Sequence, residues 1–103
     1  MIKSIYNPPH PGSIVKEALE SIPISVSEFA AYIGVARGTL SRLLNERAGI
    51  TPEMSIKITQ AFGLPSSDLL FRLQNKYDFW QAAHRVKRRK IATLKQIRMA
   101  KAA

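Results

Sequence analysis

Residues that end or cap helices recur at short intervals along the chain, with amphipathic segments between them. Their positions limit the chain to short helices. Pro23, Gly34 and Gly63 each follow a segment whose apolar residues are spaced three and four apart, which is the spacing of one helix face. Proline and glycine both end helices, and the strict apolar–polar alternation of half-buried strands is nearly absent. The sequence therefore predicts an all-α domain of short helices joined by tight turns.

Capping residues define the expected helix boundaries. Ser25 or Ser27 suits the N-cap of the second helix, because a short hydroxyl side chain accepts a hydrogen bond from a free backbone N–H. Thr51 suits the N-cap of the fourth, which has Pro52 at its first position and Gly63 just past its end. We expect helices over about residues 12–22, from the cap at Ser25 or Ser27 to Ile33, from Ala36 or Arg37 to Asn45, over 52–62, and a fifth that begins after Ser66 or Ser67.

The two short segments around Gly34 have the pattern of a helix-turn-helix. That motif needs a small residue where its helices touch, a residue that tolerates positive φ in the turn, and apolar anchors under the second helix. With Gly34 in the turn and Ala30 at the close contact, the expected anchors are Phe29, Ile33, Val35, Leu40 and Leu43. The pattern favours DNA binding over the alternative, an αα-corner that binds no nucleic acid.

The second helix of this pair carries polar residues between its leucines. Arg37 and Arg42 can bind guanine or phosphate, and Arg42 is the expected base reader. Thr39 and Ser41 are short enough to contact phosphate or a thymine methyl group. Because helix N-termini also offer free N–H groups to phosphate, the residues expected to contact DNA are Ser25, Arg37, Thr39, Ser41, Arg42, Asn45, Arg47 and Thr51.

A symmetric homodimer is expected, since one helix-turn-helix reads only a few base pairs. The segment that follows Ser67 offers a surface for it, because its apolar stripe is wider than a small domain obviously requires. The expected dimer contacts are Phe71, Tyr77, Phe79 and Trp80. Packing in the core of one subunit is the alternative for each of them.

The formal charge of +9 is distributed unevenly. Residues 1–78 contain 8 lysines and arginines against 7 acidic residues, whereas residues 79–103 contain 8 basic residues and no acidic one. We therefore divide the chain into a helix-turn-helix and dimerisation domain, 1–83, and a basic C-terminal tail, 84–103, that is helical or partly disordered. The tail suits DNA, RNA or a protein partner, or is merely solvated, while a membrane surface fits less well because its apolar stripe is thin.

Residues for catalysis or metal binding are not grouped in the sequence. His10 and His84 stand in no metal-binding motif, and the chain has no cysteine, no Gly-rich phosphate loop and no apolar run long enough to cross a bilayer. We expect no enzyme activity, no catalytic residue, no metal, no cofactor and no small-molecule substrate. We also expect no membrane association, and a bacterial cytoplasmic protein that is nucleoid-associated when bound to DNA.

Four stretches carry a family resemblance: HPGSIVKEAL, EFAAYIGVARGTLSRLLN, ITPEMSIKITQAFG and LLFRLQNKYDFW. Together they resemble the HigA-type antitoxins of type II toxin–antitoxin modules, within the lambda-repressor-like (Xre/Cro) helix-turn-helix group. The resemblance covers about residues 7–82 and implies a five-helix lambda-repressor-like domain that binds palindromic operator DNA as a homodimer. It also implies autorepression of a two-gene operon and neutralisation of a HigB-like toxin, a ribosome-dependent mRNA endonuclease.

The sequence departs from this family in two places. Leu70 and Phe71 stand near a position where relatives often carry tryptophan, and the tail is unusually basic. Two other functions stay open on sequence alone. One is a solitary Xre-type transcriptional regulator without a toxin partner, and the other is a non-enzymatic protein-interaction module.

Overall fold

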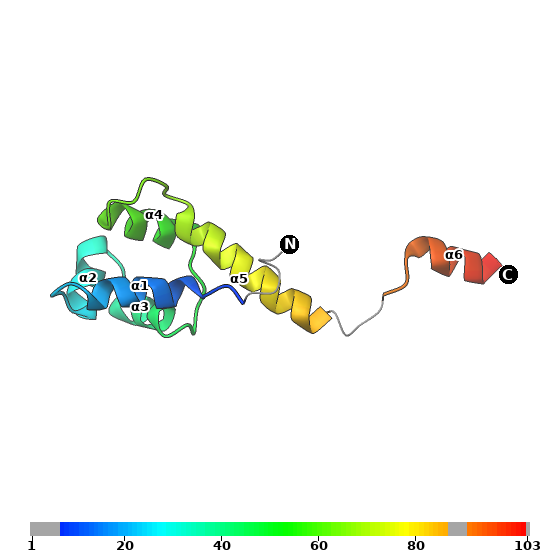
Figure 1. The fold of residues 1–103 in the computed structure, drawn as a ribbon, viewed down its shortest axis with the longest axis horizontal. Helices are drawn as coiled ribbons and strands as arrows, with labels where there is room; N and C mark the ends of the chain where they lie inside the picture. Colours follow the sequence, from blue (N-terminus) through cyan, green and yellow to red (C-terminus); the bar gives the residue numbers. More distant parts are fainter. Residues whose placement is uncertain (1–6, 87–90, 103) are drawn as a thin grey trace.

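The computed structural model describes residues 7–86 and 91–102, which form six helices and no strand. These helices are α1 (Pro11–Glu20), α2 (Val26–Ile33), α3 (Arg37–Leu44), α4 (Pro52–Ala61), α5 (Leu69–Val86) and α6 (Leu94–Ala102). Figure 1 shows α1 to α5 packed together and α6 apart from them. The prediction of an all-α, five-helix domain with a C-terminal extension is confirmed, and the extension is helical over α6.

The predicted caps form as the local sequence requires. The Ser25 hydroxyl accepts a hydrogen bond from the Glu28 N–H at 3.1 Å, and the Thr51 hydroxyl accepts one from the Met54 N–H at 3.2 Å. Gly34 and Gly63 follow α2 and α4 with φ of 75° and 69°, the left-handed conformation that glycine adopts without strain. Glu46 takes the same conformation after α3, with φ of 59°, so there a side chain occupies a position that favours glycine.

The start of α5 differs from the prediction. The helix begins at Leu69, and the expectation that Ser66 or Ser67 caps it is wrong. The Ser66 hydroxyl instead donates to the Asp68 carboxylate, and the Ser67 carbonyl accepts a hydrogen bond from the Ser55 hydroxyl of α4 at 2.7 Å. At its other end α5 continues to Val86, across the domain boundary expected at residue 83.

The hydrophobic core lies between α1, α3, α4 and α5, with α2 closing one end. Leu40 of α3 and Ile58 of α4 are fully buried at its centre. The Phe29 ring of α2 lies 5.5 Å from the Phe62 ring at the end of α4, measured between ring centroids. The buried apolar residues are Val15, Leu19, Phe29, Ala30, Leu40, Leu43, Leu44, Ile50, Met54, Ile58 and Leu70.

Gly12 allows α1 to lie directly against the backbone of α3. A Cβ atom built on Gly12 would lie 1.9 Å from the Leu43 carbonyl oxygen, far inside any van der Waals contact. His10 caps the same turn, since its Nδ1 accepts the Gly12 N–H at 2.9 Å, and its ring lies edge-on to Tyr77 with the ring centroids 4.8 Å apart. The HPG stretch therefore joins α1, α3 and α5 at one point.

Gln74 makes a second link between α5 and the remainder of the domain. It is only 5% exposed, and its Oε1 accepts the Ile50 N–H at 2.8 Å while its Nε2 donates to Asp78 at 2.9 Å. Ile50 directly precedes Thr51, the N-cap of α4. Through Gln74, α5 therefore helps to fix where α4 begins.

Candidate nucleic-acid interface

The α2–turn–α3 unit has the geometry that the sequence predicts for a helix-turn-helix. Ala30 is buried where the two helices meet, and Leu40 is 0% exposed under α3. The turn is closed by a hydrogen bond from the Val35 N–H to the Ala30 carbonyl at 2.9 Å, with Gly34 in the left-handed conformation. This packing holds α3 by one face and leaves the opposite face to solvent.

The exposed face of α3 carries two arginines, Arg37 at its first position and Arg42 in its last turn. Arg37, Gly38 and Arg42 are all exposed. Side chains on a helix lean toward its N-terminus, and the Arg42 guanidinium accordingly lies over Gly38, 3.8 Å from where a Cβ atom would be. Gly38 thus leaves a flat surface beneath the guanidinium, a contribution that sequence patterning did not identify.

A groove on one side of α3 brings three predicted residues together. It runs between α3 and the start of α4 and is lined by Thr39, Arg42 and Thr51. Lys57 of α4 also lines it, pairing with Glu53 at 3.1 Å and donating to the Gly34 carbonyl at 3.4 Å. Sequence reasoning missed Lys57, although its position one and a half turns after Thr51 was a usable signal.

Ser41 and Asn45 lie on the other side of α3. They line a second groove together with Lys16 and Glu20 of α1. Asn45 donates from its Nδ2 to the Ser41 carbonyl at 2.9 Å and lies 3.4 Å from the Ser41 hydroxyl, and Ser41 is half-buried. The structure therefore separates these two residues from the Arg42 side of the helix and satisfies them largely through each other.

Ser25 and Arg47 complete the predicted set. Both polar groups of Ser25 take part in a capping box, since its N–H donates to Glu28 Oε1 at 2.9 Å. Hydrogen bonds from the Ser25 backbone and side chain hold the pKa of Glu28 below its ordinary value, so this end of α2 carries a carboxylate at neutral pH. Arg47 is exposed, and its N–H donates to the Arg42 carbonyl at 2.8 Å in the turn after α3.

The comparisons with known proteins agree with this geometry. A model of the helix-turn-helix family matches residues 15–69, which is more than half of the chain and contains α2, the turn and α3. The chain belongs to the helix-turn-helix family. This is a family of DNA-binding regulators rather than an enzyme class.

Two curated relatives and one solved structure are similar to this helix-turn-helix protein. It is 40% identical over 76 residues to the HTH-type transcriptional regulator YddM of Escherichia coli K12, covering 74% of this chain and 80% of that one. It is 37% identical over 75 residues to virulence-associated protein A' of Dichelobacter nodosus, covering 73% of this chain and 65% of that protein. It also resembles Pseudomonas aeruginosa antitoxin HigA, solved with the higBA promoter, at 27% identity and a TM-score of 0.75, covering 84% of this chain and 98% of that one.

The four aromatic residues expected at a dimer surface of the helix-turn-helix protein have different surroundings. Phe71 is half-buried and packs against the core, and Tyr77 packs on His10. Trp80 stacks on His84 with the ring centroids 3.6 Å apart, while Phe79 is 75% exposed. Packing within one subunit thus accounts for Phe71 and Tyr77, and Phe79 is the aromatic residue of α5 that is most open to a partner.

Among the residues that the structure describes, 7–86 and 91–102, the arginines of α3 form no ion pair with an acidic side chain. The two ion pairs of these residues lie elsewhere, Glu53–Lys57 within α4 and Asp68–Arg72 at the start of α5. Within these same residues, histidines and carboxylates form no group of three or more that could hold a metal ion. None of the helices described here has the length and apolar character to cross a membrane.

Proposed function

We propose that this chain is a dimeric transcriptional repressor and the antitoxin of a HigB-like mRNA endonuclease toxin, and that it represses its own operon. The observation that carries the proposal is the exposed Arg37–Arg42 face of α3, held by a helix-turn-helix whose fold is similar to that of antitoxin HigA with its promoter. The identity of 27% to HigA supports the antitoxin role.

DNA binding follows from the placement of α3. The helix enters the major groove of operator DNA, where the Arg42 guanidinium can donate two hydrogen bonds to guanine O6 and N7. Thr39 and Thr51 line the same groove as Arg42, and we propose that they contact phosphates of the DNA backbone together with the N-terminus of α4. Arg37 and Arg47 supply further charge to the backbone, while the side chains of Ser25, Ser41, Asn45 and Thr51 are secondary contacts, because local hydrogen bonds already engage them.

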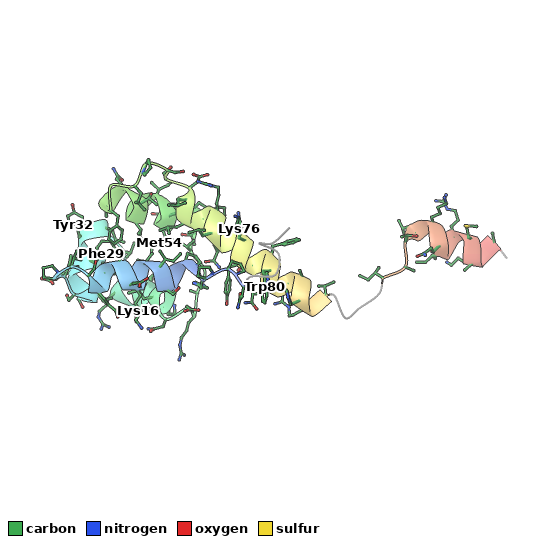
Figure 2. The ribbon with its side chains drawn as sticks, viewed as in Figure 1. Lys16, Phe29, Tyr32, Met54, Lys76 and Trp80 are labelled. Atoms are coloured by element: carbon green, nitrogen blue, oxygen red, sulfur yellow. The ribbon has the colours of Figure 1, made fainter. Side chains whose placement is uncertain are left out.

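Dimerisation through α5 is supported by the exposure of an aromatic side chain on this helix, since Phe79 is 75% exposed. We expect light scattering at micromolar concentrations to give a dimer, and Phe79→Asp to shift it toward monomer, because a charge in an apolar interface must be desolvated. Tyr32→Asp is the matched control, since Tyr32 of α2 is an equally exposed aromatic residue at the other end of the domain (Figure 2). A monomeric wild-type protein, or equal effects of both substitutions, would count against this surface.

Neutralisation of a toxin is tested by growth. We expect the small open reading frame beside this gene to arrest growth when it is induced alone, and co-expression of this chain to restore growth, because the antitoxin masks the nuclease. If the neighbour is harmless, or if growth stays arrested in the presence of this chain, the antitoxin role is wrong.

A solitary transcriptional regulator is the second candidate function. The 40% identity to YddM, whose name describes an HTH-type transcriptional regulator, favours it. Both candidates require this chain to bind operator DNA in the presence of excess scrambled DNA. A protein-interaction module that uses the same helices would fail that competition.

A further inference from the structure

Helix α6 has its own N-terminal cap although nothing buries it. The Thr93 hydroxyl accepts the Gln96 N–H at 3.1 Å and Gln96 Oε1 accepts the Thr93 N–H at 2.8 Å, which together form a capping box. Every residue from Ile91 to Ala102 is exposed. Figure 2 shows the side chains of α6 well clear of Trp80 and the remainder of α5. Local hydrogen bonds thus favour the helical conformation of α6, although no other part of the described structure packs against it.

The charges of α6 point to a polyanion as that partner. Lys95, Arg98 and Lys101 are spaced three residues apart, so they lie on one side of the helix, and residues 79–103 contain no acidic side chain to pair with them. Like charges at this spacing destabilise a helix, and a nine-residue helix without packing is marginal in water. A row of phosphates would remove the repulsion and stabilise α6.

The apolar residues of α6 fit a protein groove poorly. Leu94 and Ile97 are neighbours on the helix surface, but Met99 lies on its far side, and Arg98 and Lys101 flank Leu94. An amphipathic helix that docks in a groove presents a continuous apolar stripe instead. The apolar pair on α6 is therefore narrow and is bordered by cations.

We propose that α6 is a second DNA-binding element, in which Lys95, Arg98 and Lys101 bind phosphates of the duplex beside the site that α3 reads. This inference rests on the proposed function, because α3 supplies the duplex. Seven residues separate Val86 at the end of α5 from Leu94, and a chain of that length spans at most about 30 Å. This linker length limits the phosphates that α6 can bind to those within about 30 Å of the end of α5.

The test is the salt dependence of DNA binding by the full chain with Lys95→Gln, Arg98→Gln and Lys101→Gln combined. Each phosphate contact contributes about 0.9 to the slope of log affinity against log salt concentration, so we expect the slope to become shallower by about 2 to 3 per subunit. Fluorescence anisotropy between about 50 and 200 mM salt measures it, with duplex DNA from the region upstream of the gene and with a scrambled duplex of equal length. We expect the same loss on both duplexes, because phosphates carry no sequence information.

The matched control is Leu94→Ala combined with Ile97→Ala, which keeps every cation and a good helix-forming sequence. We expect this variant to bind both duplexes with the wild-type slope. An unchanged slope for the triple glutamine variant would overturn the proposal, and so would an equal or larger loss from the alanine control, which would identify an apolar partner. Binding of RNA with a steeper slope than duplex DNA would also overturn it, by identifying RNA as the partner.

Failure of the proposed function has a different signature. A wild-type chain that binds the upstream and scrambled duplexes equally is not a specific repressor. The slope difference between the wild type and the triple glutamine variant would still decide whether α6 binds DNA.

Discussion

Replacing Gly12 by alanine is expected to lower the free energy of unfolding by about 3 kcal/mol, at the upper end of the usual cost of inserting atoms into packed structure. The added Cβ would lie 1.9 Å from the Leu43 carbonyl oxygen, which belongs to a helix backbone and cannot rotate away. Helix α1 must therefore move off α3, which also disturbs the His10 ring against Tyr77. Thermal unfolding followed by circular dichroism should show a midpoint lower by roughly 10 to 20 °C for a domain of this size.

Gly38→Ala is the matched control for this prediction. Gly38 is the second residue of α3, as Gly12 is the second residue of α1, but the nearest neighbour of its added Cβ would be the end of the Arg42 side chain at 3.8 Å. We expect this variant to be as stable as the wild type or more stable by up to about 1 kcal/mol, because alanine loses less conformational entropy than glycine in a helix. Equal destabilisation by both substitutions would contradict this prediction, because Gly38 has no close backbone neighbour comparable to the Leu43 carbonyl.

Replacing Arg42 by alanine is expected to abolish most of the discrimination between operator and scrambled DNA. A bidentate arginine–guanine contact contributes about 1 to 3 kcal/mol, which corresponds to a loss of roughly 5- to 150-fold in operator affinity for each subunit. Stability should change by no more than about 0.5 kcal/mol, because Arg42 is exposed. Anisotropy titrations of both duplexes at one fixed salt concentration measure the effect.

Arg72→Ala is the control for Arg42→Ala, since it removes the same charge from another exposed helix position. The Arg72 guanidinium is bonded to Asp68 at 3.1 Å and to the Ser66 hydroxyl at 3.1 Å, on α5. We expect Arg72→Ala to leave the ratio of operator to scrambled affinity unchanged. If it lowers that ratio as much as Arg42→Ala does, Arg42 acts only through long-range charge and is not the base reader.

Features determined by neighbouring residues were predictable from the sequence. Ser25, Gly34, Thr51 and Gly63 act through backbone groups two to four residues away, so the local pattern is sufficient to identify them. The buried stripe of α3 follows from the spacing of its leucines in the same way. This is why the fold class and the position of the helix-turn-helix could be derived before the structure.

Features that join distant parts of the chain were not predictable. The Gln74–Ile50 hydrogen bond connects residues 24 positions apart, and the contact between Gly12 and Leu43 depends on how two helices cross. Spacing alone likewise cannot tell whether an aromatic residue faces its own core or a partner. For that reason the sequence grouped Tyr77 with Phe79, although Tyr77 packs on His10 and Phe79 is exposed.

The backbone contact between α1 and α3 means that the residues that position α3 differ from the residues proposed to bind DNA. The position of α3 is set by Gly12, by the Leu43 carbonyl and by buried leucines, whereas Arg37, Thr39 and Arg42 are exposed on the opposite face. If these exposed residues bind DNA as proposed, a change at their positions alters the preferred base sequence and leaves the packing of α3 in place. On the proposed function, the domain would then acquire a new operator through surface substitutions alone, and paralogous copies in one genome would diverge in target without first losing stability.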